Sequence, residues 1–268
     1  MRSEAAIYLR LILASIQAKM EYRATFVFLF FALFLFYAGQ IGAVLVVMDK
    51  FSAINGWNLG DMAFLYGLLS FSQGASMLFF SPLNYFEGMI QQGHFDRYLI
   101  RPLSPLLQTL SSGFEISSLA HFLIGFIALY FGSTRGGVDW DATKLFFLLM
   151  VIAGAALIHG AVRLAVSAVA FWTIRNRSLV HTIVYSSKEF IVYPISIYRV
   201  WIQVFLTVVF PIAFINFYPS HYFLARETSD MLFHPALQYL TPVIGAVAFW
   251  LSHMLWKVGI DHYQSVGS

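Results

Sequence analysis

The stretch ATFVFLFFALFLFYAGQIGAVLVVM, residues Ala24–Met48, decides the fold class. It contains 25 residues and no Asp, Glu, Lys or Arg. About 20 consecutive apolar residues suffice for an α-helix to cross the hydrocarbon of a bilayer. The run lacks the strict alternation of apolar and polar residues that membrane β-strands show. It therefore predicts a membrane-spanning helix.

Further runs without charged residues follow along the chain. They have lengths from 18 to 26 residues: Met62–Phe86, Ile116–Thr134, Leu145–Val162, Val200–Ala225 and Met231–Trp256. The run that begins at Leu145 continues past Arg163 through Leu164–Ile174. We therefore expect an all-α integral membrane protein with six transmembrane helices, in a domain that covers residues 24–258.

The composition excludes several other classes of protein. Apolar residues make up 59% of the chain and charged residues 11%, against roughly 25% charged residues in a soluble domain. The apolar excess also excludes a disordered chain. The sequence contains no cysteine, which excludes a disulfide scaffold, thiolate catalysis, Fe–S clusters and cysteine-based zinc sites.

The basic residues that flank the spans predict the orientation, because cytoplasmic loops are enriched in Lys and Arg. With the amino terminus in the cytoplasm, the inner segments hold ten: Arg2, Arg10, Lys19, Arg23, Arg97, Arg101, Arg175, Arg177, Lys188 and Lys257. The outer loops hold four: Lys50, Arg135, Lys144 and Arg226. We therefore expect both termini in the cytoplasm, with a short tail over residues 259–268. The net charge of +3 reflects this topology, and nothing indicates a nucleic-acid partner.

Residues 1–23 predict a helix that lies along the cytoplasmic membrane surface. Leu9, Leu13, Ile16 and Met20 recur at spacings of four, three and four residues, which places them on one face of a helix. Such an amphipathic helix binds between lipid headgroups and acyl chains. The alternative is a plain juxtamembrane basic tail.

The longest predicted cytoplasmic loop, residues 82–108, follows the second span. Leu83–Gln92 can form a short helix that Gly93 stops. Asp96 and Arg97 are charged residues among apolar neighbours. Such a loop suits docking to a soluble partner, and the alternative is a stiff connector.

The segment 218–236, on the outer side, is too apolar for a solvated loop, yet it carries charged residues such as Arg226 and Asp230. Re-entrant half-helices that dip into the outer leaflet would explain this composition, since non-helical backbone at membrane depth must be covered by protein. Pro211 and Pro242 predict kinks in the last two spans.

The stretch GHFDRYLIRPLSP, residues Gly93–Pro105, resembles the permease subunits of ABC-2-type transporters, in the branch with six spans and no fused ATPase. That branch carries a G-x-F-D-x-Y-L-x-R-P pattern after the second span. The residues that match it are Gly93, Phe95, Asp96, Tyr98, Leu99, Arg101 and Pro102. Tyr193-Pro194, Pro211–Ala213 and Tyr218-Pro219 also look similar to that branch. Span count, topology and the amphipathic start agree, so the resemblance covers nearly the whole chain.

The resemblance implies that two permease subunits, identical or paralogous, pair in the cell membrane around a translocation path. Each would dock a cytoplasmic ABC ATPase subunit through the loop after the second span, at Glu87, Phe95, Asp96, Arg97 and Arg101. None of the five lysines follows a glycine, so the sequence holds no Gly-Lys-Ser/Thr phosphate-binding loop. ATP and Mg²⁺ would therefore bind the partner, and this chain would carry no cofactor and no enzymatic activity of its own.

Ionisable groups inside membrane spans are costly and point to function. Glu115 opens the third span, and Arg163 lies at a compatible depth in the fourth, so an ion pair between them is predicted. We interpret it as a gate or a subunit contact, and the alternative is a static pair that joins two helices. His159 lies one turn from Arg163 on the same helix face. The spans hold too few acidic residues for a metal site, so we expect His121, His159 and His253 to form interhelical hydrogen bonds.

The fourth span is also rich in small residues. Ala156 and Gly160, and likewise Ala161 and Ala165, are four residues apart, a spacing that permits close helix approach. This composition predicts either a helix buried within the bundle or one that lines the seam between two subunits.

The leading functional hypothesis is the membrane subunit of an ATP-driven exporter for an amphipathic or hydrophobic substrate, such as a drug, a peptide or a lipid-like molecule. An intramembrane enzyme is the second hypothesis, although the sequence shows neither a G-x-S-x-G elbow nor converging carboxylates. A standalone secondary carrier is the third, although no clear repeat relates residues 24–134 to residues 145–256.

Overall fold

The computed structural model describes residues 8, 10, 13, 14, 17, 23–51, 53–113, 115, 118–173 and 175–265. Most of the predicted interfacial helix, residues 1–23, lies outside this part of the chain, as do the last three residues of the predicted tail. The described residues Tyr8, Arg10, Leu13, Ala14 and Gln17 are helical.

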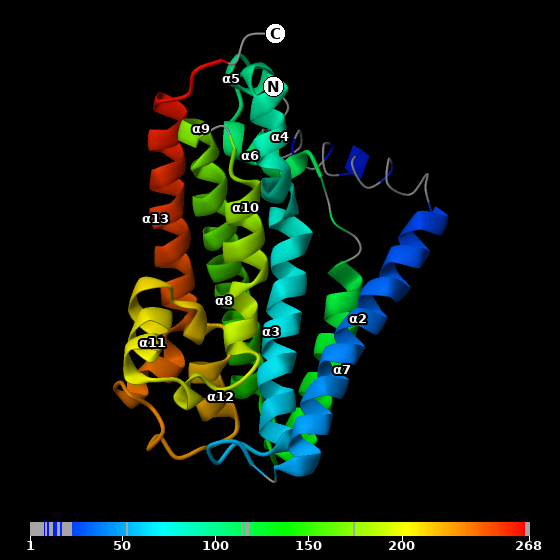
Figure 1. The fold of residues 1–268 in the computed structure, drawn as a ribbon, viewed down its shortest axis with the longest axis vertical. Coiled ribbons are helices and arrows are strands. Elements are labelled where there is room, and N and C mark those ends of the chain that lie inside the picture. The colour runs from blue at the N-terminus through cyan, green and yellow to red at the C-terminus, as the bar shows by residue number, and fades with distance from the viewer. Residues whose placement is uncertain are drawn as a thin grey trace.

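Long helices form the body of the described chain (Figure 1). These are α2 (Arg23–Lys50), α3 (Leu59–Phe80), α7 (Leu119–Arg135), α8 (Ala142–Ala168) and α13 (Thr241–Asp261). Within the residues that the structure describes, four are long and apolar enough to cross a membrane, and α7 is shorter, with 17 residues. They correspond to the first, second, fourth and sixth predicted spans, and α7 to the third. The all-α membrane fold is thereby confirmed.

Short helices gather at one end of this bundle (Figure 1). They are η1 (Ser81–Tyr85), α4 (Phe86–Gln91), α5 (Asp96–Leu99) and α6 (Pro105–Ser111). We call this end the α5 end. The loop between α2 and α3 lies at the opposite end, so α3 runs the length of the bundle between them.

Local chemistry sets where the long helices begin. Asn58 accepts the backbone N–H of Asp61 at 3.1 Å, and Asp61 accepts that of Asn58 at 3.0 Å, so α3 starts with a capping box. Asp141 caps α8 by accepting the N–H of Lys144 at 2.6 Å. The predicted kink at Pro242 is wrong, because Pro242 lies in the first turn of α13, where its missing N–H costs no hydrogen bond.

Glycines let two pairs of helices pack with their backbones in contact. A Cβ atom on Gly132 of α7 would lie 2.5 Å from the Phe64 nitrogen of α3. One on Gly245 of α13 would clash with the Gly154 oxygen of α8. The close helix approach predicted for the small-residue span is therefore present, and it places α8 against α13 inside the bundle.

α2 is the most exposed of the long apolar helices. Only 6% of its span is buried, against 67% for the span that begins with α3. Figure 1 shows α2 leaning away from the other helices toward the α5 end. Its sides therefore remain open to lipid or to another protein.

The chain between α8 and α11 passes from one end of the bundle toward the other. It contains α9 (Ala170–Thr173), α10 (Arg177–Leu179), the π-helical η3 (Val180–Tyr185), η4 (Ser187–Ile191) and η5 (Ile195–Ile197). The Asn176 N–H donates to Glu87 of α4 at 2.8 Å. The Asn216 side chain donates to the Ile191 oxygen at 2.6 Å and to the Leu65 oxygen of α3 at 3.3 Å. The segment 176–191 therefore runs alongside α3, from the α5 end to the opposite half.

A sharply bent pair of helices follows this segment. Its halves are α11 (Val200–Val204) with η6 (Phe205–Val209), and η7 (Ile212–Phe214) with α12 (Phe217–Phe223). They meet at 81° around Pro211, which confirms the predicted kink there. In Figure 1 both halves lie in the half of the bundle away from α5. The irregular region predicted at 218–236 thus extends back to Val200, and it ends with η8 (Pro235–Tyr239).

This arrangement corrects the predicted fifth span, Val200–Ala225. That run is apolar but bent, and the segment 176–191 makes the passage along the bundle instead. Lys188, which we had expected in a cytoplasmic loop, lies beside Tyr37 in the middle of α2, with Nζ 3.5 Å from the Tyr37 hydroxyl. The prediction was wrong because the charges of Lys188 and Glu189 interrupt the apolar run, although contacts with α2 accommodate them.

Candidate coupling surface and intramembrane polar cluster

The loop after α3 folds much as its residues predict. η1 and α4 together cover residues 81–91, close to the short helix predicted at Leu83–Gln92. Gly93 then adopts φ = +64°, a conformation that only glycine adopts without strain. The chain can therefore reverse between α4 and α5.

Phe95 lies in the core of the α5 end. Its side chain is fully buried, and its ring centroid lies 5.3 Å from that of Phe86, 5.4 Å from Phe171, 6.2 Å from Trp256 and 5.3 Å from Tyr263. Edge-to-face packing of this kind stabilises aromatic clusters beyond area burial alone. Phe95, predicted as a contact for a partner, thus positions α5 against α9 (Ala170–Thr173) and α13.

Asp96 ties α5 to the residues after α13. Its Oδ1 accepts from the Tyr263 hydroxyl at 2.8 Å, and its Oδ2 accepts from the Ser265 hydroxyl at 2.7 Å. The bonds from Ser265 and Tyr263 lower the pKa of the Asp96 carboxyl from its ordinary value. Burial and the hydrogen bond to Asp96 raise the pKa of Tyr263 to about 12. The two hydrogen bonds to Asp96 stabilise the folded state fully above the ordinary pKa of Asp. This stabilisation is lost only as the pH falls through the lowered pKa of Asp96.

We expect Asp96→Asn to release the tail, since the amide has one acceptor oxygen and no charge. Limited proteolysis followed by mass measurement should show several-fold faster cleavage after α13. The effect should be equal at pH 6 and pH 8, because neither pKa lies in that range. The exposed Asp139, changed to Asn, is the matched control and should leave cleavage unchanged. Equal cleavage of the Asp96→Asn and Asp139→Asn variants would contradict a role of Asp96 in holding the residues after α13.

Glu87 joins α4 to the start of the segment 176–191. Its Oε2 accepts the Asn176 N–H at 2.8 Å, and its Oε1 accepts from Gln91 at 3.0 Å. The buried Asn176 side chain donates to the Val166 oxygen of α8 at 2.7 Å. Sequence reasoning missed Asn176, because a single Asn between two arginines gives no signal of a long-range contact.

The surface of the α5 end consists of Arg97, Leu99, Ile100 and Arg101, which we call the α5 surface. Arg97 and Arg101 are exposed, and Ile100 is 84% exposed. Leu99 is exposed as well, so two adjacent apolar side chains lie open between the two cations, and exposed apolar patches with a polar rim mark interaction sites. Sequence reasoning selected the two arginines and missed Ile100.

Arg163 is deeply buried, 1% exposed, in α8. Its Nη1 donates to the Asn84 Oδ1 of η1 at 2.8 Å, and the Asn84 amide donates to the Tyr185 hydroxyl at 3.1 Å. Within the part of the chain that the structure describes, its Nε and Nη2 have no hydrogen-bond partner. The hydrogen bond described for Arg163 is therefore to Asn84 and not to Glu115, the predicted partner. Glu115 itself is half-buried before α7.

A cluster of polar side chains lies at membrane depth between α2, α3, α7 and η4. Lys188 Nζ lies 5.0 Å from the Tyr37 ring centroid, and the His121 ring centroid lies 4.4 Å from that of Tyr37. Tyr66 donates to the Gln40 Oε1 at 3.2 Å. We call Tyr37, Gln40, Tyr66, His121 and Lys188 the polar cluster.

His121, His159 and His253 do not form the interhelical hydrogen bonds predicted for them among the described residues. Both ring nitrogens of the buried His121 and the Nε2 of His159 have no partner there. His253 Nδ1 is also without one. The same part of the chain holds no group of three His or carboxylate side chains that could bind a metal ion.

A second polar cluster closes the opposite end. Arg226 donates to the Asp61 Oδ2 at 2.6 Å and to the Gly56 oxygen at 3.1 Å, and its guanidinium lies 4.1 Å from the Trp57 ring centroid. Trp57 donates to the Asp230 Oδ2 at 2.8 Å. Although partial burial opposes it, the hydrogen bond and charge of His221 contribute to a lowered Asp230 pKa. These contacts fix the chain after α12 to the start of α3.

Comparison with known protein families gives a match. The model of a family described as ABC-2 family transporter protein matches residues 34–267. No curated protein and no solved structure matches the chain. The matched range includes α3, the loop from α4 to α6 and all later helices.

Proposed function

The chain belongs to the ABC-2 family of transporter proteins, and from that premise we propose that it is the membrane-spanning subunit of an ATP-driven exporter. These 268 residues contain no Gly-Lys pair, so they lack the loop that cradles nucleotide phosphates. We therefore assign ATP binding and hydrolysis to a separate ABC ATPase, and substrate passage to this chain.

The α5 end is the cytoplasmic end in this proposal, and the protein lies in the cell membrane with both termini inside. Moving Lys188 from the loops to membrane depth leaves nine basic residues on the inner side, against five on the outer side once Arg199, which follows the passage at 176–191, is counted there. This excess still follows the positive-inside rule. The α5 surface would then face the compartment that holds ATP.

The α5 surface is the proposed contact for the ATPase. The observation that carries this assignment is the exposure of Ile100 between two exposed arginines. A force applied there can reach two membrane segments, α13 and the segment 176–191, through direct contacts. Phe95 packs on α13 through Trp256, Asp96 bonds to the residues after α13, and Glu87 bonds to the start of the segment 176–191.

A second permease subunit, identical or paralogous, completes the proposed transporter. α2 is little buried, and the neighbouring segment 176–191 carries exposed residues along its length. A second copy placed against these two elements would enclose the polar cluster between the subunits. The substrate would then move along a path that is apolar except at that cluster.

The double variant Arg97→Glu, Ile100→Asp should lose the ATPase. It reverses one charge and places a carboxylate where an apolar contact is proposed, so we expect at least about a tenfold loss of binding, since one lost anchor costs over ~1.4 kcal/mol. The measurement is vanadate-sensitive ATP hydrolysis in material purified through a tag on the permease, from its native membranes in mild detergent.

The control for this experiment is Lys50→Glu, a charge reversal at an exposed position at the far end of α2. It should retain the ATPase activity of the unmodified protein. Equal activity in the double variant and the control, with equal permease yield, would refute the assignment of the α5 surface. Absence of ATPase activity from every preparation, the unmodified protein included, would refute the ATP-driven mechanism itself.

A further inference from the structure

Two buried basic side chains near the polar cluster have donors without acceptors. Arg163 is 1% exposed, and its Nε and Nη2 have no hydrogen-bond partner within 3.5 Å among the described residues, although the Tyr185 hydroxyl interacts with the guanidinium. His121 is also 1% exposed, and neither ring nitrogen has a partner there. Buried polar groups without partners cost free energy, and a buried charge costs more. Such groups point to a ligand that supplies acceptors.

The charges around these donors favour an anion. Lys188 and Arg163 act electrostatically on each other, and both act on the rings of His121 and His159. The carboxylate that faces the cluster is Glu189, which is exposed and lies 3.5 Å from the Gln40 amide. Tyr37, Tyr66 and Tyr185, the other titratable neighbours, add no charge while protonated. This region thus contains two cations, Lys188 and Arg163, and one carboxylate, Glu189.

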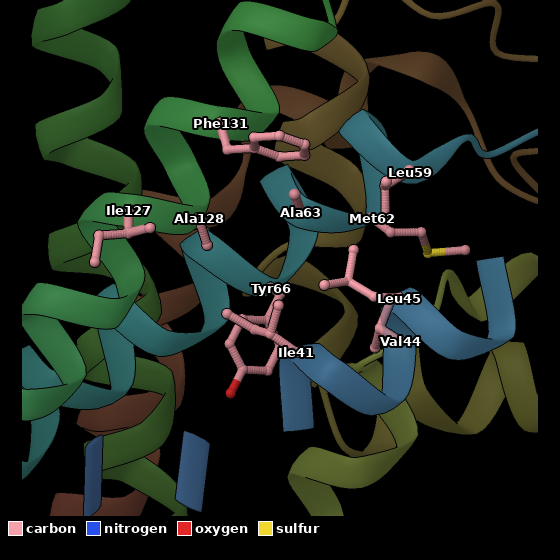
Figure 2. Close-up of a pocket in the computed structure, with 10 residues that line it drawn as sticks. All are labelled: Ile41, Val44, Leu45, Leu59, Met62, Ala63, Tyr66, Ile127, Ala128 and Phe131. Atoms are coloured by element: carbon pink, nitrogen blue, oxygen red, sulfur yellow. The ribbon is translucent and has the colours of Figure 1, made fainter. Parts of the chain in front are cut away.

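The polar cluster shares a side chain with an apolar cavity. A small cavity of about 10 Å³ is lined by Tyr37, Tyr66, His121 and Lys188, and also by Glu189. A cavity of about 240 Å³, lined by Tyr66 and otherwise by apolar side chains, lies between α2, α3 and α7. Figure 2 shows Tyr66 at the edge of the larger cavity, with its hydroxyl pointing away from Phe131. The Tyr66 ring therefore separates a polar from an apolar compartment.

The same helix, α2, forms one wall of both compartments. Tyr37 and Gln40 contribute to the polar compartment and Ile41, Val44 and Leu45 to the apolar one, all from α2. α2 packs loosely, with 6% of its span buried. A small outward shift of α2 would open the two compartments into each other.

We propose that these compartments form one binding site for an anionic amphipath. Its carboxylate or phosphate head lies at Lys188, with Arg163 as the second cation, and its alkyl chain fills the apolar cavity of Figure 2. This inference rests on the proposed transport function and names the substrate class of that function. The head supplies the missing acceptors, and the chain removes apolar surface from water.

Binding to the purified permease tests the site without any ATPase. The protein is placed in nanodiscs of phosphatidylcholine, and displacement of radiolabelled dodecanoate is measured. Dodecanoate and dodecyl phosphate should bind at least about tenfold more tightly than dodecanol, a difference of about 1.4 kcal/mol, and dodecylamine should bind most weakly. Acetate and inorganic phosphate distinguish a free-anion site from an amphipath site, and should displace nothing at the same concentrations.

Variants separate the two compartments. Lys188→Gln should weaken dodecanoate about tenfold and leave dodecanol unchanged, whereas Lys188→Arg should retain binding. Ala63→Phe, on the cavity wall in Figure 2, should weaken both ligands. Lys257→Gln, at an exposed position of α13, is the matched control and should change neither. Thermal unfolding of each variant establishes that it is folded.

Three results would overturn the proposal. They are equal binding of dodecanoate, dodecanol and dodecylamine, displacement by acetate or phosphate as effective as that by dodecanoate, and unchanged dodecanoate binding in folded Lys188→Gln. Failure here leaves the α5 surface experiment unaffected, because that experiment measures ATP hydrolysis and not ligand binding. Success here with no associated ATPase would keep the site and refute the ATP-driven mechanism.

Discussion

Phe95→Ala should destabilise the purified permease by about 3–5 kcal/mol, the usual cost of removing a fully buried aromatic ring. Phe95 is enclosed by the rings of Phe86, Phe171, Trp256 and Tyr263. Because close-packed surroundings relax only partially, the cavity left by the substitution should not collapse fully. We would measure the free energy of unfolding in detergent from denaturant titration followed by tryptophan fluorescence.

If the proposed ATPase docks at the α5 surface, the same substitution should uncouple it from the membrane helices, because Phe95 anchors α5 to α13. Phe95→Leu, which keeps most of the volume, should recover part of the stability. Phe126→Ala is the control, since Phe126 is 61% exposed on α7 and should cost little. A Phe95→Ala protein as stable as the Phe126→Ala protein would show that the aromatic cluster does not hold α5.

Arg226→Met should cost about 3–5 kcal/mol, because it leaves the Asp61 carboxylate buried without its cation. Asp61 is 5% exposed and Arg226 is 19% exposed, so the lower end of that range is expected. The loss should appear as a lower unfolding temperature and as faster proteolysis of the chain between α12 and η8.

The double variant Asp61→Asn, Arg226→Met tests the mechanism of that loss. Removing both charges leaves no unpaired ion, so we expect it to recover most of the stability. Arg135→Met, at an exposed position beside the same polar hollow, should be close to neutral. A double variant less stable than Arg226→Met would mean that the capping of α3 by Asp61, and not its ion pair, dominates.

The spans bounded by charged residues could be predicted from the sequence. The first was predicted at Ala24–Met48 and is α2, Arg23–Lys50. Its limits follow from composition, because charges are excluded from the hydrocarbon and helices are the local structure that satisfies every backbone group there. The pattern around Gly93 likewise predicted a helix that ends at a glycine, and Gly93 has a positive φ.

The passage at residues 176–191 could not be predicted in this way. Lys188 and Glu189 end the apolar run, and the partners that accommodate them, Tyr37 and Gln40, lie about 150 positions earlier on α2. A hydropathy average depends only on residues that are adjacent in the sequence. The free-energy cost of a charge at membrane depth depends instead on the residues that surround it in the folded structure. For the same reason the apolar run at Val200–Ala225 gave no sign of its 81° bend beyond one proline.

The sequence by itself determined that this protein is a bundle of membrane helices of the ABC-2 family, and it marked Asp96 and Arg97 as a charged pair in an apolar loop. Only the tertiary structure decided what each residue does. Asp96 bonds to Tyr263, 167 positions away, whereas Arg97 stays exposed. Composition and periodicity fix local states because they act over a few residues. The partner of a polar group depends on which helices pack together, and only the folded chain contains that information.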